Sequence, residues 1–136
     1  MTSLNKEYFA AGIAVTMNKL ILLGRRSVFC ENLAGYWSIP SGLIEKEETP
    51  EDAARREFFE ETGILARKNI LFIGDFEITT DKYFALFSFE VKSLIFPSTS
   101  AQDAFEHDEW GFFKIGKKTL PTPMSDDLID LIIKLK

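Results

Sequence analysis

The sequence is poor in features that would place it outside the cell or in a membrane. Its 136 residues contain one cysteine, Cys30, which excludes an internal disulfide and is typical of a reducing compartment. We expect Cys30 to be a buried, unreactive thiol. No apolar run approaches the roughly 18 residues of a membrane span, and residues 1–8 lack the apolar core of a signal peptide. We therefore expect a cytoplasmic protein with no membrane partner.

An excess of basic residues is also missing, because the formal net charge is −5. This balance argues against a partner such as duplex nucleic acid, which a broad basic face would hold. An anionic small molecule stays compatible, since a bound metal can reverse the local field. The length and the 46% of apolar residues predict a single domain over residues 1–136 with a proper core. The sequence carries no sign of an oligomeric state.

The apolar pattern predicts six strands and two helices. The strands are expected at 9–16, 20–23, 36–39, 69–78, 83–91 and 110–115, and the helices at 50–62 and from about 125. A long, polar and acidic connection is expected at 93–109. The resulting order, β-β-β-α-β-β-β-α, implies a mixed sheet with helices packed on it.

The helix at 50–62 has clear signals at both ends. Thr49 is a good N-cap, Pro50 suits the first helical position, and Asp52 stands at the capping-box position. Gly63 suits the left-handed residue that ends a helix. These signals fix which side chains share one face of the helix.

Three glutamates occupy one face of that helix, because Glu57, Glu60 and Glu61 stand at positions i, i+3 and i+4. Like charges at this spacing repel each other, so an ordinary helix gains nothing from them. On an arbitrary acidic helix they would be a solvated face. A divalent cation on this face would turn the repulsion into attraction, and carboxylate oxygens are ligands that magnesium prefers.

The surrounding segment, 42–64, resembles the Nudix box, G-x5-E-x7-R-E-U-x-E-E-x-G-U, in which U is a bulky aliphatic or similar residue. The nine defined positions are occupied by Gly42, Glu48, Arg56, Glu57, Phe58, Glu60, Glu61, Gly63 and Ile64. Phe58 is aromatic at a usually aliphatic position, and Ser41 replaces a glycine that many members carry. The resemblance implies an α/β (α+β) fold of the Nudix type, an α/β/α sandwich with a mixed β-sheet.

The resemblance also implies a Mg²⁺-dependent hydrolase, with Mn²⁺ as a substitute, that cleaves a phosphoanhydride bond in a nucleoside diphosphate linked to a further group. The metal would be held by the Gly42 carbonyl, Glu57, Glu60 and Glu61. Glu48 and Arg56 would support the site, because a planar guanidinium can fix a carboxylate in a bidentate pair. A nucleoside triphosphate is the first substrate to consider, followed by dinucleoside polyphosphates, ADP-ribose and nucleotide sugars. The alternative of another class is a nucleotide-binding regulatory module without turnover.

The general base stays open between Glu60, Glu61 and Glu106. Glu106 belongs to the acidic stretch 106–109, where Nudix enzymes often add one more carboxylate, and Glu109 is the second choice there. His107, the single histidine, has a pKa class suited to proton transfer, but we expect it at the surface.

Other side chains are weaker candidates for substrate contacts. Arg25 and Arg26 follow the second predicted strand and are candidates for binding substrate phosphates. Four aromatic residues could stack on a base, although core packing is the expectation for each of them: Tyr36, Trp37, Phe76 and Tyr83.

Overall fold

The computed structural model describes residues 6–135. The prediction that residues 1–8 are no signal peptide therefore lies mostly outside the described residues. The elements follow in the order β1 (Glu7–Met17), β2 (Leu20–Arg26), β3 (Trp37–Ser38), β4 (Ser41–Leu43), α1 (Pro50–Thr62), β5 (Leu71–Thr79), β6 (Lys82–Glu90), the 3-10 helix η2 (Ala104–Glu106), β7 (His107–Lys114) and α2 (Asp126–Ile133). Within residues 6–135, no helix has the length and apolar character needed to cross a membrane.

Strand β1 lies at the centre of a mixed sheet. It pairs in parallel with β6 and antiparallel with both β2 and β4. The main path of the sheet is β3-β2-β1-β6-β5, with β7 paired to β2. The predicted mixed sheet is therefore confirmed, and the described residues add one strand, β4, that the pattern did not predict.

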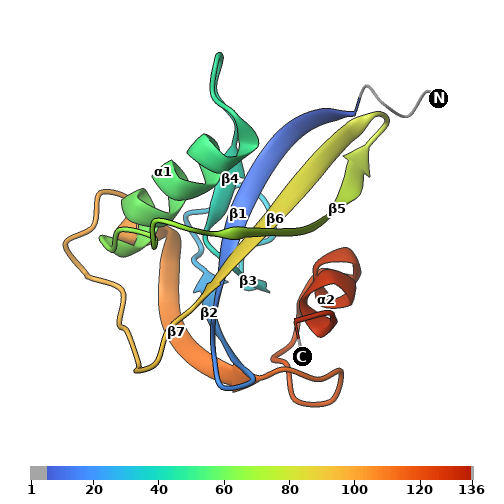
Figure 1. Cartoon of the computed structure of the whole chain (residues 1–136). Coiled ribbons are helices and arrows are strands. Elements are labelled where there is room, and N and C mark those ends of the chain that lie inside the picture. Colours follow the sequence, from blue (N-terminus) through green and yellow to red (C-terminus); the bar gives the residue numbers. More distant parts are fainter. Residues whose placement is uncertain (1–5, 136) are drawn as a thin grey trace.

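The two helices cover opposite faces of the sheet (Figure 1). Helix α1 packs Ala54 and Phe58 into one apolar cluster, and α2 packs Leu128 and Leu131 into another. Phe58, the aromatic departure from the box, is fully buried, and its ring centroid lies 5.6 Å from that of Phe89. Burying a side chain of this size contributes roughly 1.5–3 kcal/mol. The α/β/α sandwich is thereby confirmed.

Helix α1 has the bounds that its capping signals predicted. The Thr49 Oγ1 accepts the Asp52 N–H at 3.0 Å, and the Asp52 carboxylate accepts the Thr49 N–H at 3.2 Å. At the other end, Gly63 has φ 75°, which favours glycine, and its N–H donates to the Phe59 carbonyl at 2.8 Å. These caps set the rotation of the glutamate face.

The structure differs from the expected elements at two places, and both place additional backbone segments near α1. After Pro40 the chain resumes as β4, and Ser41 pairs with Gly12 on β1. A Cβ at Gly12 would lie 2.6 Å from that of Ser41, so the glycine in β1 leaves room for the serine. Later in the sequence, β7 begins directly after η2, at His107 instead of residue 110.

Candidate metal and active site

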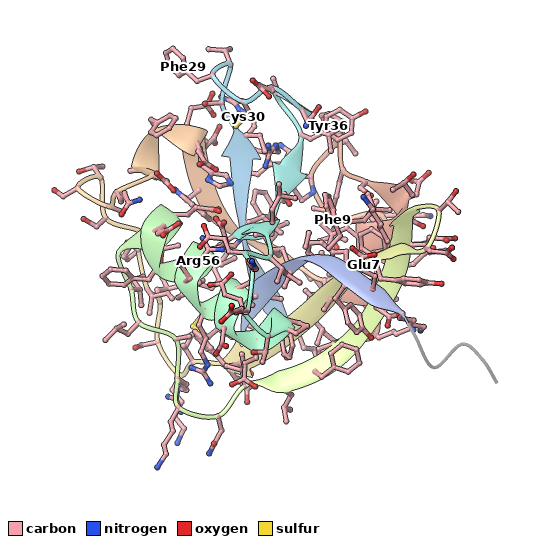
Figure 2. The ribbon with its side chains drawn as sticks, turned by 90° about the horizontal axis from the view of Figure 1, so that it is seen from above. Glu7, Phe9, Phe29, Cys30, Tyr36 and Arg56 are labelled. Atoms are coloured by element: carbon pink, nitrogen blue, oxygen red, sulfur yellow. The ribbon has the colours of Figure 1, made fainter. Side chains whose placement is uncertain are left out.

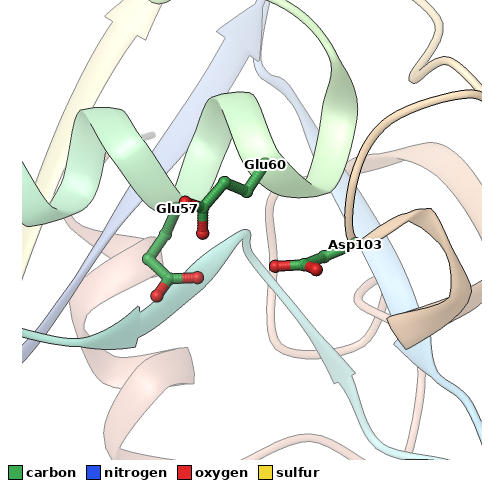
Figure 3. A group of neighbouring side chains, drawn as sticks. All are labelled: Glu57, Glu60 and Asp103. Atoms are coloured by element: carbon green, nitrogen blue, oxygen red, sulfur yellow. The ribbon is translucent and has the colours of Figure 1, made fainter.

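A group of three carboxylates lies between α1 and the segment before η2. Glu57, Glu60 and Asp103 each offer an oxygen atom, and these atoms lie within 4.8 Å of one another. Figure 3 shows the Glu57 and Glu60 side chains extending from the helix close to each other, with the Asp103 carboxylate pointing toward them from the neighbouring segment. The Asp103 N–H donates to the Glu60 carbonyl at 2.7 Å, which holds the two chain segments together. Hard oxygen donors this close together suit a cation such as magnesium.

Arg56 supplies positive charge to this acidic group. Its Nη1 donates to Glu57 Oε2 at 3.0 Å and to Glu60 Oε1 at 3.2 Å. The hydrogen bonds to the carboxylates raise the pKa of Arg56, with the bonds to Glu48 contributing most. Figure 2 shows Arg56 on α1, near the middle of the molecule seen from above. The guanidinium therefore offsets part of the repulsion among the glutamates.

The loop between β4 and α1 is fastened to the helix by the other side of Arg56. Its Nε and Nη2 donate to the two carboxylate oxygens of Glu48 at 2.7 and 3.0 Å, a bidentate pair. Nη2 also donates to the Leu43 carbonyl at 3.0 Å. The bonds from Arg56 lower the pKa of Glu48, and that carboxylate also accepts the Glu45 N–H at 2.8 Å. Glu48 and Arg56 thus form the frame on which the acidic group is built.

Gly42 lies directly against Glu57. A Cβ at residue 42 would overlap the Glu57 carboxyl group, so glycine is required for this close approach of strand and side chain. Burial raises the pKa of Glu57, and the bonds from Glu61 and Arg56 act in the opposite direction. The structure therefore brings Gly42, Glu57 and Glu60 together.

Glu61 lies on the buried side of this group. Its side chain is 1% exposed, and burial, followed by the neighbouring Glu57, raises its pKa well above the usual value. The Ser41 backbone amide faces it and lowers the pKa. Among the described residues, the close group of possible metal ligands contains Asp103, and Glu61 is outside it.

His107 is buried, so the expectation of a surface histidine was wrong. Its side chain is 1% exposed, and its Nδ1 lies 3.8 Å from Glu61 Oε1. Burial, followed by the nearby Arg26, lowers the pKa of His107 to about 4. The imidazole is neutral at pH 7, and its contact with Glu61 is therefore not an ion pair.

A cavity of about 600 Å³ opens beside the acidic group. Its lining includes Gly42, Glu57 and Glu106 from the region of the acidic group, and also the aromatic residues Phe76 and Phe84. The two phenylalanine rings are stacked, with centroids 5.1 Å apart and planes 18° apart. Phe76 thus packs against the core, as expected, and also lines the cavity.

The remaining candidates divide into two groups. Arg26 and Glu106 line the cavity, and burial, followed by the charges of Asp103 and Glu57, raises the pKa of Glu106. Arg25 lies outside the cavity lining, and its guanidinium pairs with Asp108 at 2.9 Å and Glu109 at 3.4 Å. The structure therefore places Arg26 and Glu106 beside the acidic group and leaves Arg25 and Glu109 on the surface.

A smaller cavity of about 270 Å³ adjoins the first, and Arg26, Asn32 and Glu106 line both. Cys30 also lines it and is half-buried, less buried than expected, with its Sγ donating to the Glu106 carbonyl at 3.3 Å. Figure 2 shows Phe29 at the outer tip of the loop between β2 and β3, beyond Cys30.

The geometry agrees with a comparison to known families, in which the family model described as NUDIX domain matches residues 7–131. The chain belongs to the NUDIX domain family. One curated relative is an 8-oxo-dGTP diphosphatase of Proteus vulgaris, 34% identical over 64 residues, which cover 47% of this chain and 56% of the relative. The matched stretches cover between 28% and 56% of the curated relatives, so the likeness concerns about half of their length or less.

Solved structures show the same NUDIX fold over nearly the whole chain. A MutT NUDIX hydrolase from Burkholderia pseudomallei has a TM-score of 0.70 and 21% identity, with 96% of this chain and 99% of the other covered. A C. elegans Ap4A hydrolase, solved as a binary complex, has a TM-score of 0.63 and 18% identity, with 93% of each chain covered. At these identities the likeness establishes the fold alone.

Proposed function

We propose that this NUDIX protein is a metal-dependent hydrolase that cleaves a phosphoanhydride bond in a nucleoside diphosphate linked to a further group. A nucleoside triphosphate is the first substrate in this proposal, and Mg²⁺ is the cofactor, with Mn²⁺ as a substitute. The observation that carries the proposal is that the box residues Gly42, Arg56, Glu57 and Glu60 contact one another beside a cavity that Gly42 and Glu57 line. The presence of a single cysteine, which cannot form an internal disulfide, fits the reducing, cytoplasmic location that we propose.

The residues of the acidic group fit a divalent cation. Glu57, Glu60 and Asp103 supply hard oxygen donors, and Gly42 and Glu61, which both adjoin Glu57, complete the group that the family resemblance implies. When bound, the metal would neutralise phosphate charge and acidify a water molecule. Arg56 already holds positive charge against Glu57 and Glu60, which supports the view that a cation stabilises these carboxylates.

The cavity supplies the place for the substrate. Its volume of about 600 Å³ lies within the roughly 300–1,000 Å³ that small-molecule sites occupy. Phe76 and Phe84 offer apolar lining for a base, and Arg26, which lines the same cavity, is our candidate for a contact with phosphate. Arg25 is already paired with Asp108 and Glu109, so we assign it no contact with substrate.

Glu106 is our candidate for the group that accepts the proton of the attacking water. It lines the cavity together with Glu57 but comes from η2 instead of the helix that carries the metal-holding glutamates. Burial raises its pKa, and a base is most effective when its pKa approaches the working pH. Glu60 and Glu61 are left to hold and support the metal.

The test replaces one metal-holding carboxylate without changing its shape. Glu60→Gln should leave the fold intact and lower kcat about 100-fold, equivalent to about 3 kcal/mol of transition-state stabilisation. Glu51→Gln, on the first turn of the same helix and paired with Arg55, is the matched control and should keep wild-type kcat. Wild-type turnover by Glu60→Gln in saturating Mg²⁺ would remove the metal assignment. Tight nucleotide binding without product in the wild type would indicate a regulatory module instead.

A second candidate substrate is a dinucleoside polyphosphate, which the adjoining cavity favours. Arg26 and Glu106 form a shared wall, so one molecule could extend across both cavities. The second cavity is bounded by Phe29 and Phe105, whose side chains are 75% and 58% exposed. Stacking of a base on such a ring contributes roughly 1–3 kcal/mol.

A substrate panel separates the two candidates. The panel compares a nucleoside triphosphate, a dinucleoside tetraphosphate, ADP-ribose and a nucleotide sugar by kcat/KM, with products identified by mass spectrometry. Phe105→Ala should lower kcat/KM for the dinucleotide alone if the second cavity binds a base. Phe96→Ala, another exposed phenylalanine, lies outside the lining of both cavities and is the control.

A further inference from the structure

A buried polar pair lies behind the acidic group. His107, the first residue of β7, faces Glu61 on α1, with 3.8 Å between Nδ1 and Oε1 and each side chain 1% exposed. Within residues 6–135, both ring nitrogens of His107 and the Oε2 atom of Glu61 are buried without a hydrogen-bond partner. Leaving such a group unsatisfied costs about 1–3 kcal/mol. Folding alone would therefore favour an apolar residue at position 107.

The local fold is arranged to place this ring. Arg25 pairs with Glu109 but Arg26 pairs with His107, so Asp108 is the extra residue of a β-bulge. Without the bulge, His107 would share a face with Glu109, two residues away. The bulge turns the imidazole to the face of Trp110, which packs in the cluster under α1. Bulges re-aim side chains next to functional sites.

Gly24 on strand β2 leaves the space that the imidazole ring of His107 occupies. A Cβ at Gly24 would lie 2.7 Å from Cδ2 of His107 and 2.8 Å from Cζ3 of Trp110. The two rings lie with their centroids 4.5 Å apart. The β-bulge, Gly24 and Trp110 together fix His107 against Glu61. The hydrogen bonds that the two side chains lose on burial are not replaced by bonds between them.

We infer that His107 is a positioning residue that orients Glu61 from behind, so that this carboxylate supports the metal-holding group. The inference rests on the proposed function, since it requires that the acidic group bind a divalent cation. A neutral imidazole has one N–H donor to offer to a carboxylate, and Nδ1 is the ring nitrogen that faces Glu61. At 3.8 Å the two atoms form no hydrogen bond in the structure, and in this role of His107 one would form when Glu61 turns to support a bound cation. Replacing a side chain that hydrogen-bonds to the ligands of a metal typically changes the metal affinity about 10- to 100-fold.

The experiment measures stability and metal affinity in the same variants without substrate. His107→Leu removes the donor and the unsatisfied ring nitrogens, whereas His107→Asn keeps an N–H donor near the position of Nδ1. Melting temperatures are recorded for the metal-free proteins. Mn²⁺ alone is titrated, and the free ion is followed by electron paramagnetic resonance.

For a positioning residue we expect the two measurements to move in opposite directions. His107→Leu should melt at or above the wild-type temperature and bind Mn²⁺ at least about tenfold more weakly. His107→Asn should bind within about threefold of wild type, which is rescue by the retained donor. If His107→Leu fails to fold, His107→Met, also apolar and more adaptable, takes its place.

Three results would overturn the inference. Wild-type Mn²⁺ affinity in His107→Leu would show that the ring does not act on the metal group. A melting temperature and an affinity that fall together in both variants would show a purely structural role. A wild-type protein that binds no Mn²⁺ would refute the metal site itself and the inference with it, which distinguishes failure of the proposed function from failure of this step.

Discussion

The glutamates of α1 fall into two environments, a paired side with Glu57 and Glu60 and a buried side with Glu61, and each environment acts differently on their negative charge. On the paired side, Glu57 and Glu60 share one guanidinium, since Arg56 donates to both at 3.0 and 3.2 Å. On the buried side, Glu61 faces the neutral ring of His107, and its Oε2 atom has no partner among the described residues. On the paired side a permanent cation offsets part of the repulsion, and on the buried side burial raises the pKa of the carboxyl group.

The difference shows how the free protein tolerates a crowded group of carboxylates. The permanently charged guanidinium of Arg56 donates hydrogen bonds to Glu57 and Glu60 and so stabilises them. Burial raises the pKa of Glu61 well above its usual value, so this carboxyl group keeps its proton to higher pH. A bound divalent cation would relieve both sides, because it attracts the charged form of every carboxylate near it.

Removing the guanidinium should produce the largest effect. Arg56→Met leaves Glu48, Glu57 and Glu60 without their shared cation, and breaking such a partly buried network costs about 3 kcal/mol of unfolding free energy. Urea denaturation without metal should show this loss, and saturating Mg²⁺ should recover more of it than it adds to the wild type. Arg55→Met is the control, because Arg55 bonds to Glu51 and to backbone carbonyls away from the cavity. An Mg²⁺ response in Arg55→Met equal to that of Arg56→Met would contradict the comparison.

The buried side should show itself in the pH dependence of stability. A carboxyl group whose pKa is raised in the folded state stabilises the fold below its unfolded pKa, and this stabilisation is lost as pH rises toward the folded pKa. Glu61→Gln, which cannot ionise, should match the metal-free wild type near pH 4 and exceed it in stability at pH 8. A displacement of one pKa unit corresponds to about 1.4 kcal/mol.

The measurement for Glu61→Gln is urea denaturation at several pH values, with Glu90→Gln at the exposed end of β6 as control. Burial lowers the pKa of His107 to about 4, so its own contribution rises between about pH 4 and 6.5 and is present in both proteins. The difference between the two curves therefore isolates Glu61. Parallel curves from pH 4 to 8 would show that Glu61 ionises normally.

Local chemistry made much of the site predictable from sequence. Thr49 and Gly63 fixed both ends of α1, and the spacing of Glu57 and Glu60 then fixed their common face. The pairing of Arg56 with a carboxylate followed from the geometry of guanidinium, and the structure assigns Glu48 as the partner. Each of these features depends on residues close together in the chain.

The features that were not predicted depend on contacts between distant segments. Asp103 reaches Glu60 through a backbone hydrogen bond between residues 43 positions apart, and no periodicity marks it in an irregular acidic stretch. The burial of His107 requires a β-bulge and a glycine on a neighbouring strand, and neither has a local sequence signature. Strand β4 was missed because Pro40 indicated an end, whereas pairing with β1 restarts the strand.

Shortening the N-cap of α1 should have the smallest effect and should leave both sides of the helix unchanged. Thr49→Ala removes the Oγ1 that accepts the Asp52 N–H, and loss of such a cap costs about 1 kcal/mol. Because Glu57, Glu60 and Glu61 lie two to three turns further along the helix, Mn²⁺ affinity and the pH dependence of stability should equal those of the wild type. Urea denaturation and Mn²⁺ titration of the same sample check both statements. A weaker Mn²⁺ affinity would mean that the start of the helix, and not only Arg56 and His107, positions the carboxylates.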